Sequence, residues 1–139
     1  MDRITRRPLD IIVIDDEFLI RWAISRTLAA AGHRVREAGD ARSAISMLRS
    51  GESLPDVVLL DYRLPGVSGL DLLSAIRALS PHTAIVMMSA DTTPDTMREA
   101  VRRGAYRVMQ KPFDMEMVEP ALVGATLARQ RDDARASGR

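Results

Sequence analysis

Short apolar runs alternate with amphipathic stretches along most of this chain. The runs are four or five residues long and lie at residues 10–14, 34–38, 57–60, 84–88 and 106–110. Runs of this length are too short for buried helices and are typical of strands in a parallel sheet, with 34–38 the weakest of the five. The pattern therefore predicts five strands.

A stretch with helical periodicity follows each run. In the first, residues 18–31, Ile20, Ile24 and Leu28 recur at four-residue spacing, and Gly32 follows at the position that favours a left-handed cap. The other helices are predicted after Asp40, over 70–79, after Thr93-Pro94, and from Asp114 to about Arg129, with a kink or a late start at Pro120.

Strands that alternate with helices predict an α/β protein. We expect a flavodoxin-like, doubly wound (βα)5 sandwich whose parallel five-stranded sheet has the order 2-1-3-4-5. The first and third strands are neighbours in this order, so Asp15-Asp16 and Asp61 should lie side by side. Met97, Ala100 and Val101 are expected to form the apolar face of the fourth helix.

Composition removes several classes of function. The 139 residues carry a net charge of +1, no cysteine and two histidines, so disulfides, thiolate metal sites and a histidine-rich metal site are not expected. Neither a membrane-spanning run nor a secretory signal is present, which predicts a cytoplasmic protein without a membrane partner. Direct nucleic-acid binding is not expected either.

The two ends differ from the middle of the chain. Residues 1–8 are predicted to be a flexible basic arm and residues 130–139 a polar tail, which leaves residues 9–129 as one domain. Because no second domain follows, we expect the output to be a binding event.

Candidate chemistry lies where four of the predicted strands end. Asp15-Asp16, Asp61, Ser89 and Lys111-Pro112 each close an apolar run, and Lys111 is the only lysine. Ligands of open α/β sheets bind at the carboxyl edge, where these four positions should meet. Each has an ordinary alternative: helix caps for Asp15-Asp16, an Asx turn for Asp61, a plain strand-end hydroxyl, and a surface lysine.

Clustered carboxylates repel one another and call for a positive partner. Oxygen ligands suit a hard cation such as Mg²⁺, and an ammonium group can bind the oxygens of a phosphoryl group that shares the ion. Asp61 is the central acid, and carboxylates can accept phosphoryl groups covalently. The cluster therefore predicts a phosphoryl site.

Four motifs in order resemble the receiver domain of bacterial two-component response regulators. They are IIVIDDE at 11–17, VVLLDYRLPGVSGLDLL at 57–73, IVMMSA at 85–90 and GAYRVMQKPF at 104–113, and the resemblance covers about residues 9–129. It implies a phosphoacceptor signalling switch in which a histidine kinase or histidine phosphotransferase phosphorylates Asp61.

The resemblance also assigns roles to single residues. It implies that Asp16, Asp61 and the backbone carbonyl of Arg63 bind Mg²⁺, or Mn²⁺ in its place, and that Asp15 reaches the ion through water. It implies that Ser89 and Lys111 bind the phosphoryl oxygens and that the Lys111-Pro112 bond is cis. The fourth helix, fifth strand and fifth helix would contact a downstream protein or a second copy of the chain.

The chain departs from the family pattern on the fifth strand. The family usually has an aromatic residue three positions before the lysine, where this chain has Val108. Tyr106 is two residues earlier and is expected on the same face by strand alternation. We therefore expect a switch that works through the loop after Ser89 and the fourth helix, without an aromatic rotamer change.

Other residues extend the expected site. Phe18, Leu19 and Trp22 lie off the apolar face of the first helix, and we predict that they form the docking patch for the phosphodonor; the alternative is that Trp22 covers the edge of the core. Arg63 and Asp91 flank the pocket, where the resemblance implies control of dephosphorylation.

Rival functions remain open at this point. We expect a protein that is not an enzyme on other substrates, because it promotes transfer only to and from its own Asp61. One alternative is a receiver cut from a larger response regulator with a DNA-binding output domain. Another is a metal-dependent phospho-aspartyl phosphatase, although Arg63 stands where such enzymes carry a general acid. A flavodoxin would need a hydroxyl-rich loop after the first strand, which is absent from this sequence.

Overall fold

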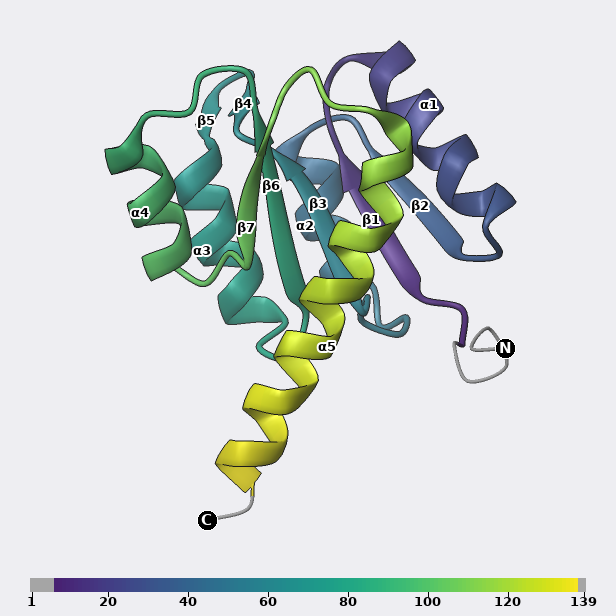
Figure 1. Cartoon of the computed structure of the whole chain (residues 1–139), viewed down its shortest axis with the longest axis vertical. Coiled ribbons are helices and arrows are strands. Elements are labelled where there is room, and N and C mark those ends of the chain that lie inside the picture. Colours follow the sequence, from purple (N-terminus) through teal and green to yellow (C-terminus); the bar gives the residue numbers. More distant parts are fainter. Residues whose placement is uncertain (1–6, 138–139) are drawn as a thin grey trace.

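The apolar runs form one parallel sheet in the computed structural model, which describes residues 7–137 (Figure 1). The strand order is β2-β1-β3-β6-β7, which is the predicted 2-1-3-4-5 order when the five main strands are counted along the chain. The strands are β1 (Asp10–Ile14), β2 (Arg34–Ala38), β3 (Val57–Asp61), β6 (Ala84–Ser89) and β7 (Arg107–Gln110). The predicted flavodoxin-like fold is confirmed.

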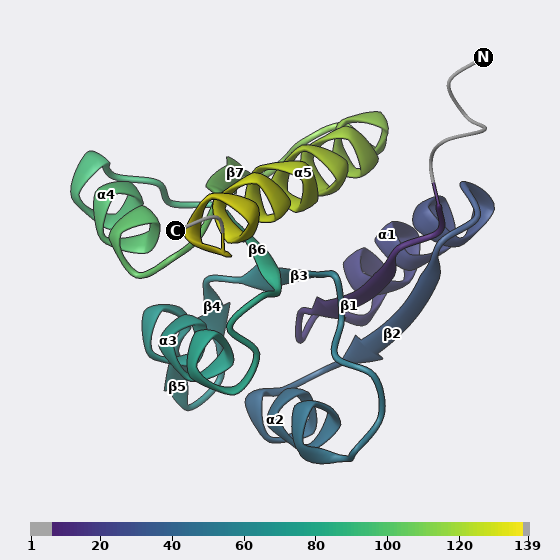
Figure 2. The ribbon, with the colours of Figure 1, turned by 90° about the horizontal axis from the view of Figure 1, so that it is seen from below.

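Helices cover both faces of this sheet, as the view from below shows (Figure 2). One face is covered by α1 (Phe18–Ala30) and α5 (Val118–Ser137), and the other by α2 (Ala41–Arg49), α3 (Gly69–Leu79) and α4 (Pro94–Arg102). Alternate residues of β1 supply the two cores: Ile12 and Ile14 pack on the α2–α3 side, and Ile11 and Val13 pack on the α1–α5 side. This burial on both faces explains why the central strands are almost wholly apolar.

The first four helices begin and end close to the residues that the sequence indicates. The side chains of Asp40, Ser68 and Thr93 each accept a hydrogen bond from a backbone N–H in the first turn of α2, α3 and α4. Gly32, just after α1, has a φ of 99°, which side chains other than glycine rarely adopt.

The last helix starts late, as predicted, but its cap and its end differ from the prediction. A 3-10 turn, η2 (Met115–Met117), precedes α5, which confirms the late start, but the side chain of Asp114 makes no capping hydrogen bond there. The predicted end at Arg129 is wrong, because α5 continues to Ser137 and projects beyond the sheet (Figure 1).

Side-chain contacts and sequence composition both favour the extra length of α5. Asp133 pairs with Arg129 one turn earlier, at 3.4 Å, and with the imidazole of His82 at 3.2 Å. Residues 130–137, the part of α5 beyond its predicted end, contain no glycine or proline. The polar tail is therefore helical up to residue 137. The division into arm, domain and tail stays a prediction. Residues 1–6 of the predicted arm lie outside the described residues.

Two predictions near β7 are wrong. Ala100 is the buried residue of α4, but Met97 and Val101 are exposed, because α4 lies beside an edge strand and is covered only in part. Tyr106 precedes β7, so strand alternation does not set its direction: its ring lies over Gly124 of α5, whereas Val108 is buried on the α2–α4 side. The two residues therefore do not share a face.

Candidate functional site

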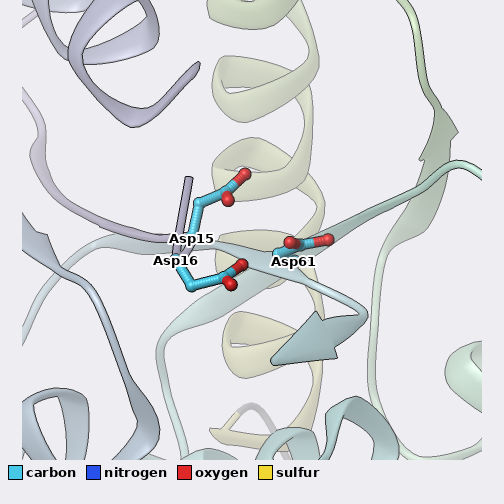
Figure 3. A group of neighbouring side chains, drawn as sticks. All are labelled: Asp15, Asp16 and Asp61. Carbon is cyan, nitrogen blue, oxygen red and sulfur yellow. The ribbon is translucent and has the colours of Figure 1, made fainter. Parts of the chain in front are cut away.

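Three acidic side chains meet at the carboxyl edge of the sheet. Asp15 and Asp16 follow β1 and Asp61 ends the neighbouring strand β3, so the strand order places them together. Their carboxylates lie close around one small space in Figure 3, and one oxygen of each lies within 4.8 Å of the others. Asp15 and Asp61 are buried, whereas Asp16 is exposed.

Lys111 supplies the positive charge at this cluster. Its Nζ lies 3.1 Å from Asp15 Oδ2, 3.4 Å from Asp61 Oδ1 and 3.7 Å from Glu17 Oε1. The backbone N–H of Lys111 donates to the carbonyl of Ser89 at 2.8 Å, which holds the ends of β6 and β7 together. The predicted convergence of Lys111 and Asp61 is confirmed, and so is the cis Lys111-Pro112 bond.

Burial and charge set the protonation of this site. Burial of the Asp61 carboxyl, with the negative charge of Asp15 beside it, raises the pKa of Asp61 to about 6 although Lys111 opposes the shift. Burial lowers the pKa of the Lys111 ammonium, but the hydrogen bond and the charge of Asp15 outweigh burial, so the net shift is upward. Lys111 therefore stays charged, while burial and the charge of Asp15 disfavour the ionised form of Asp61.

Ser89 is buried at the end of β6, and its hydroxyl bonds within its own loop. The oxygen accepts a hydrogen bond from the Asp91 N–H at 3.1 Å and donates to the Asp91 carbonyl at 3.3 Å. To bind a phosphoryl oxygen, this hydroxyl must exchange its bond to the Asp91 carbonyl for the new acceptor.

An open cleft of about 700 Å³ lies beside Asp61 and Lys111. One wall is a short hairpin formed by β4 (Arg63–Leu64) and β5 (Val67–Ser68), whose turn the Pro65-Gly66 pair predicts. The hairpin closes tightly: a Cβ added to Gly69 would lie 2.3 Å from the Tyr62 carbonyl oxygen. Any larger residue at position 69 would clash with the Tyr62 backbone and displace the segment that follows Asp61.

Arg63 lies two residues after Asp61 and makes two side-chain or backbone contacts at the site. Its N–H donates to Asp61 Oδ1 at 3.4 Å, so Asp61 does make the contact of an Asx turn as well as facing the cleft. Its guanidinium pairs with Asp91 at 3.5 Å across the mouth of the site. The role of the Arg63 carbonyl as a metal ligand stays a prediction.

The predicted docking residues are exposed. Phe18, Leu19 and Trp22 are 61%, 73% and 46% exposed, as a docking patch requires, and docking itself stays a prediction. Arg21 and Arg26 lie against the rings of Phe18 and Trp22, at 5.6 and 5.2 Å from the ring centres. The patch is thus an apolar surface with cations against its rings.

Sequence reasoning missed two residues at this site. Glu17 approaches Lys111, and its position directly after Asp16 was the available signal. Arg21 donates to the backbone carbonyl of Asp15 at 2.7 Å, a contact that no sequence motif announces.

The donor set fits a hard divalent cation. The three carboxylates offer only oxygen ligands, which Mg²⁺, Mn²⁺ and Ca²⁺ prefer, and one side of the cluster opens to the solvent through Asp16. The arrangement can thus hold a metal ion next to the Asp61 carboxylate.

Comparisons with known proteins agree with this geometry. Residues 11–122 match the response regulator receiver domain family. The chain is 36% identical over 116 residues to the DNA-binding transcriptional regulator NtrC of Azospirillum brasilense. This matched region covers 81% of this chain and 24% of that protein. It is 33% identical to the probable transcriptional regulatory protein TcrX of Mycobacterium tuberculosis, over 85% of this chain and 50% of TcrX.

A solved structure extends the likeness to three dimensions. The receiver domain of NtrX from Brucella abortus superposes with a TM-score of 0.77 at 36% identity, over 84% of this chain and 98% of that one. The chain spans about a quarter of the NtrC protein and half of TcrX. Within the part of the chain that the structure describes, no helix is long and apolar enough to cross a membrane. The fold, the acidic cluster with its lysine, and the family match together show that the chain belongs to the response regulator receiver domain family.

Proposed function

We propose that this protein is a signalling switch that accepts a phosphoryl group on Asp61. The observation that carries the proposal is the position of the Lys111 ammonium 3.4 Å from the Asp61 carboxylate, beside an acidic cluster that fits a divalent cation. A carboxylate between a metal site and a fixed cation is placed to react with a dianionic phosphoryl group, whose charge both partners offset.

In the proposed step, an Asp61 oxygen attacks the phosphorus of a phosphohistidine on a histidine kinase or histidine phosphotransferase. A P–O bond forms to Asp61 as the P–N bond breaks, and the imidazole nitrogen keeps the electron pair of the broken bond. Lys111 and the Ser89 hydroxyl hold the phosphoryl oxygens. Asp15, Asp16, Asp61 and the Arg63 carbonyl would hold Mg²⁺, or Mn²⁺ in its place, which neutralises charge on the transferred group.

A mass measurement tests this function. Incubation of the chain with Mg²⁺ and acetyl phosphate, a small phosphodonor, should give an acid-stable, base-labile increase in mass of one phosphoryl group. Asp61→Asn should abolish the increase, and Asp71→Asn, which changes an exposed acid on α3, should leave it unchanged. An increase that survives Asp61→Asn would contradict the proposal, as would no increase in the unaltered chain.

The output is a binding event at the face formed by α4, β7 and α5. Met97, Val101, Tyr106 and Met117 are large apolar side chains exposed there, which suits a downstream protein or a second copy of this chain. Val108 replaces the usual aromatic residue, and Tyr106 lies over α5. Phosphorylation of Asp61 should therefore shift the loop after Ser89 and α4, without an aromatic rotamer change. The protein acts in the cytoplasm and is not an enzyme on other substrates.

A second candidate function concerns a longer protein. The NtrC and TcrX relatives extend well beyond the matched region, and their names are those of transcriptional regulators. In that arrangement α5, which projects past the sheet, leads into a DNA-binding output domain, and the receiver chemistry is unchanged.

Turnover of an exogenous phosphoester would instead favour the phosphatase alternative.

The docking patch gives a separate prediction. Replacing Trp22 with alanine should slow transfer from a phosphorylated histidine kinase or phosphotransferase about tenfold, because aromatic anchors at interfaces each contribute about 1–3 kcal/mol. Phosphorylation by acetyl phosphate should keep its rate, because Trp22 makes no described contact with the acidic cluster. The ratio of the two rates is the measurement, and an equal loss with both donors would count against docking.

A further inference from the structure

Arg21, on the first turns of α1, joins the acidic loop to the end of β2. Its Nη1 donates to the backbone carbonyl of Asp15 at 2.7 Å, and its Nε donates to the carboxylate of Glu37 at 2.8 Å. The Arg21 side chain is only 16% exposed, and its bond to the Asp15 carbonyl is partly buried, whereas its bond to Glu37 is open to solvent. A guanidinium that donates to two fixed acceptors is held in one orientation.

The carbonyl that Arg21 binds belongs to the peptide that connects Asp15 to Asp16. The other side of Asp15 is also held, since its N–H donates to the Ala38 carbonyl at 3.1 Å and its Oδ1 accepts from the Glu17 N–H at 2.8 Å. Asp16 differs: within residues 7–137, its exposed carboxylate makes no hydrogen bond or ion pair. The Asp16 carboxylate is therefore placed by the backbone that carries it and by rotation about its own side-chain bonds.

The corner after β2 leaves room for this guanidinium. A Cβ added to Gly39 would lie 3.2 Å from Arg21 Nη1, tighter than most contacts of that kind. The absence of a side chain at 39 lets Arg21 reach over the corner to Asp15. The Arg21 guanidinium is thus held between Glu37 and the Asp15 carbonyl, in the space left by Gly39.

We propose that Arg21 is a positioning residue of the metal and phosphoryl site: by fixing the Asp15–Asp16 peptide, it aims the Asp16 carboxylate at the cation. The inference rests on the proposed function, because it concerns the same cation. Arg21 does not touch the ion or the phosphoryl group, and it acts through the backbone of the two acids. Partners that orient metal ligands in this way typically change metal affinity 10–100-fold when lost.

The test is Mg²⁺ affinity of the full chain, measured by titration and read from the amide NMR signals of Glu17 and its neighbours. Arg21→Gln should raise the Mg²⁺ dissociation constant about tenfold. Arg21→Lys can reach only one of the two acceptors, so its Mg²⁺ dissociation constant should lie between those of the unaltered chain and Arg21→Gln. Arg49→Gln removes a cation from an exposed position at the end of α2, away from the acidic loop, and should bind as the unaltered chain does.

The sign of the change separates positioning from charge. Loss of a cation near a divalent ion should by itself tighten binding, so weaker binding by Arg21→Gln cannot come from charge. Glu37→Gln loses an anion but keeps an acceptor for Arg21, so positioning predicts a change of less than about twofold. Urea unfolding of each variant checks that the fold is kept.

Two failures can be told apart. If the unaltered chain shows no Mg²⁺-dependent shifts, the proposed function is wrong. If the unaltered chain binds Mg²⁺ and folded Arg21→Gln binds it equally or more tightly, Arg21 is a structural residue only and the inference is wrong. Gly39→Ala, which crowds the same guanidinium, should weaken Mg²⁺ binding in the same direction as Arg21→Gln.

Discussion

Replacement of Lys111 with methionine is expected to slow phosphorylation of Asp61 by acetyl phosphate about 100-fold, because loss of one preorganised donor to a transition-state oxygen typically costs 10²–10³ in rate. Methionine keeps the length of the side chain and removes the charge. The ammonium now lies within 3.7 Å of three carboxylates, so its loss also leaves Asp15 and Asp61 without their cation. The rate would be followed by mass spectrometry at fixed Mg²⁺.

Two further variants make that result interpretable. Arg107→Met removes a cation from an exposed position on the same strand, β7, and should leave the rate unchanged. Lys111→Arg keeps the charge but replaces the compact ammonium with a larger, planar guanidinium. Its phosphorylation rate should fall less than that of Lys111→Met. If Lys111→Met reacts as fast as Arg107→Met, Lys111 has no part in the transfer.

Asp61→Asn is expected to stabilise the fold at neutral pH while it abolishes phosphorylation. The pKa of Asp61 is about 6 in the folded protein and near 3.8 in the unfolded chain, so the folded state binds this proton more tightly. The contribution of Asp61 to stability is complete below about pH 4 and is lost as the pH rises through 6. Above pH 7 the ionised carboxylate costs about 2–3 kcal/mol, which the asparagine removes.

Urea unfolding at several pH values measures this gain. The free energy of unfolding of Asp61→Asn should exceed that of the unaltered chain by about 2 kcal/mol at pH 7.5, and the difference should vanish near pH 4. Asp71→Asn, at an exposed position, provides the control. Added Mg²⁺ should narrow the gap at pH 7.5, because it stabilises the ionised site in the unaltered chain alone. A gap that is independent of pH would contradict the assigned cause.

The part of the molecule that could be predicted is the part governed by hydrophobic period and chain order. The runs ending at Asp15 and Asp61 are buried on both sides, so their length and composition leave little choice but central parallel strands. Strand order then brings Asp61 beside Asp15-Asp16 without knowledge of any side-chain angle. Lys111 follows β7, two strands away from β3, and reaches Asp61 with its long side chain.

What could not be predicted depends on contacts across elements or at the edges of the sheet. Tyr106 lies outside β7, where the two-residue period no longer applies, and its ring turns to α5. Near the end of α5, Asp133 meets His82 from a distant loop, a contact that no local sequence pattern indicates. Arg21 looks like a surface residue of α1 in the sequence, because nothing there indicates that the Asp15 carbonyl lies within its reach.

The solitary amine of Lys111 has a practical consequence. Reductive methylation with ¹³C-formaldehyde would label it and the α-amino group alone, since no other side chain is a primary amine. Dimethyl-lysine keeps its positive charge, and its methyl carbons would sit beside the carboxylates of Asp15 and Asp61. The receiver thus offers one isotopic reporter at the point where metal binding and phosphorylation each change the local field.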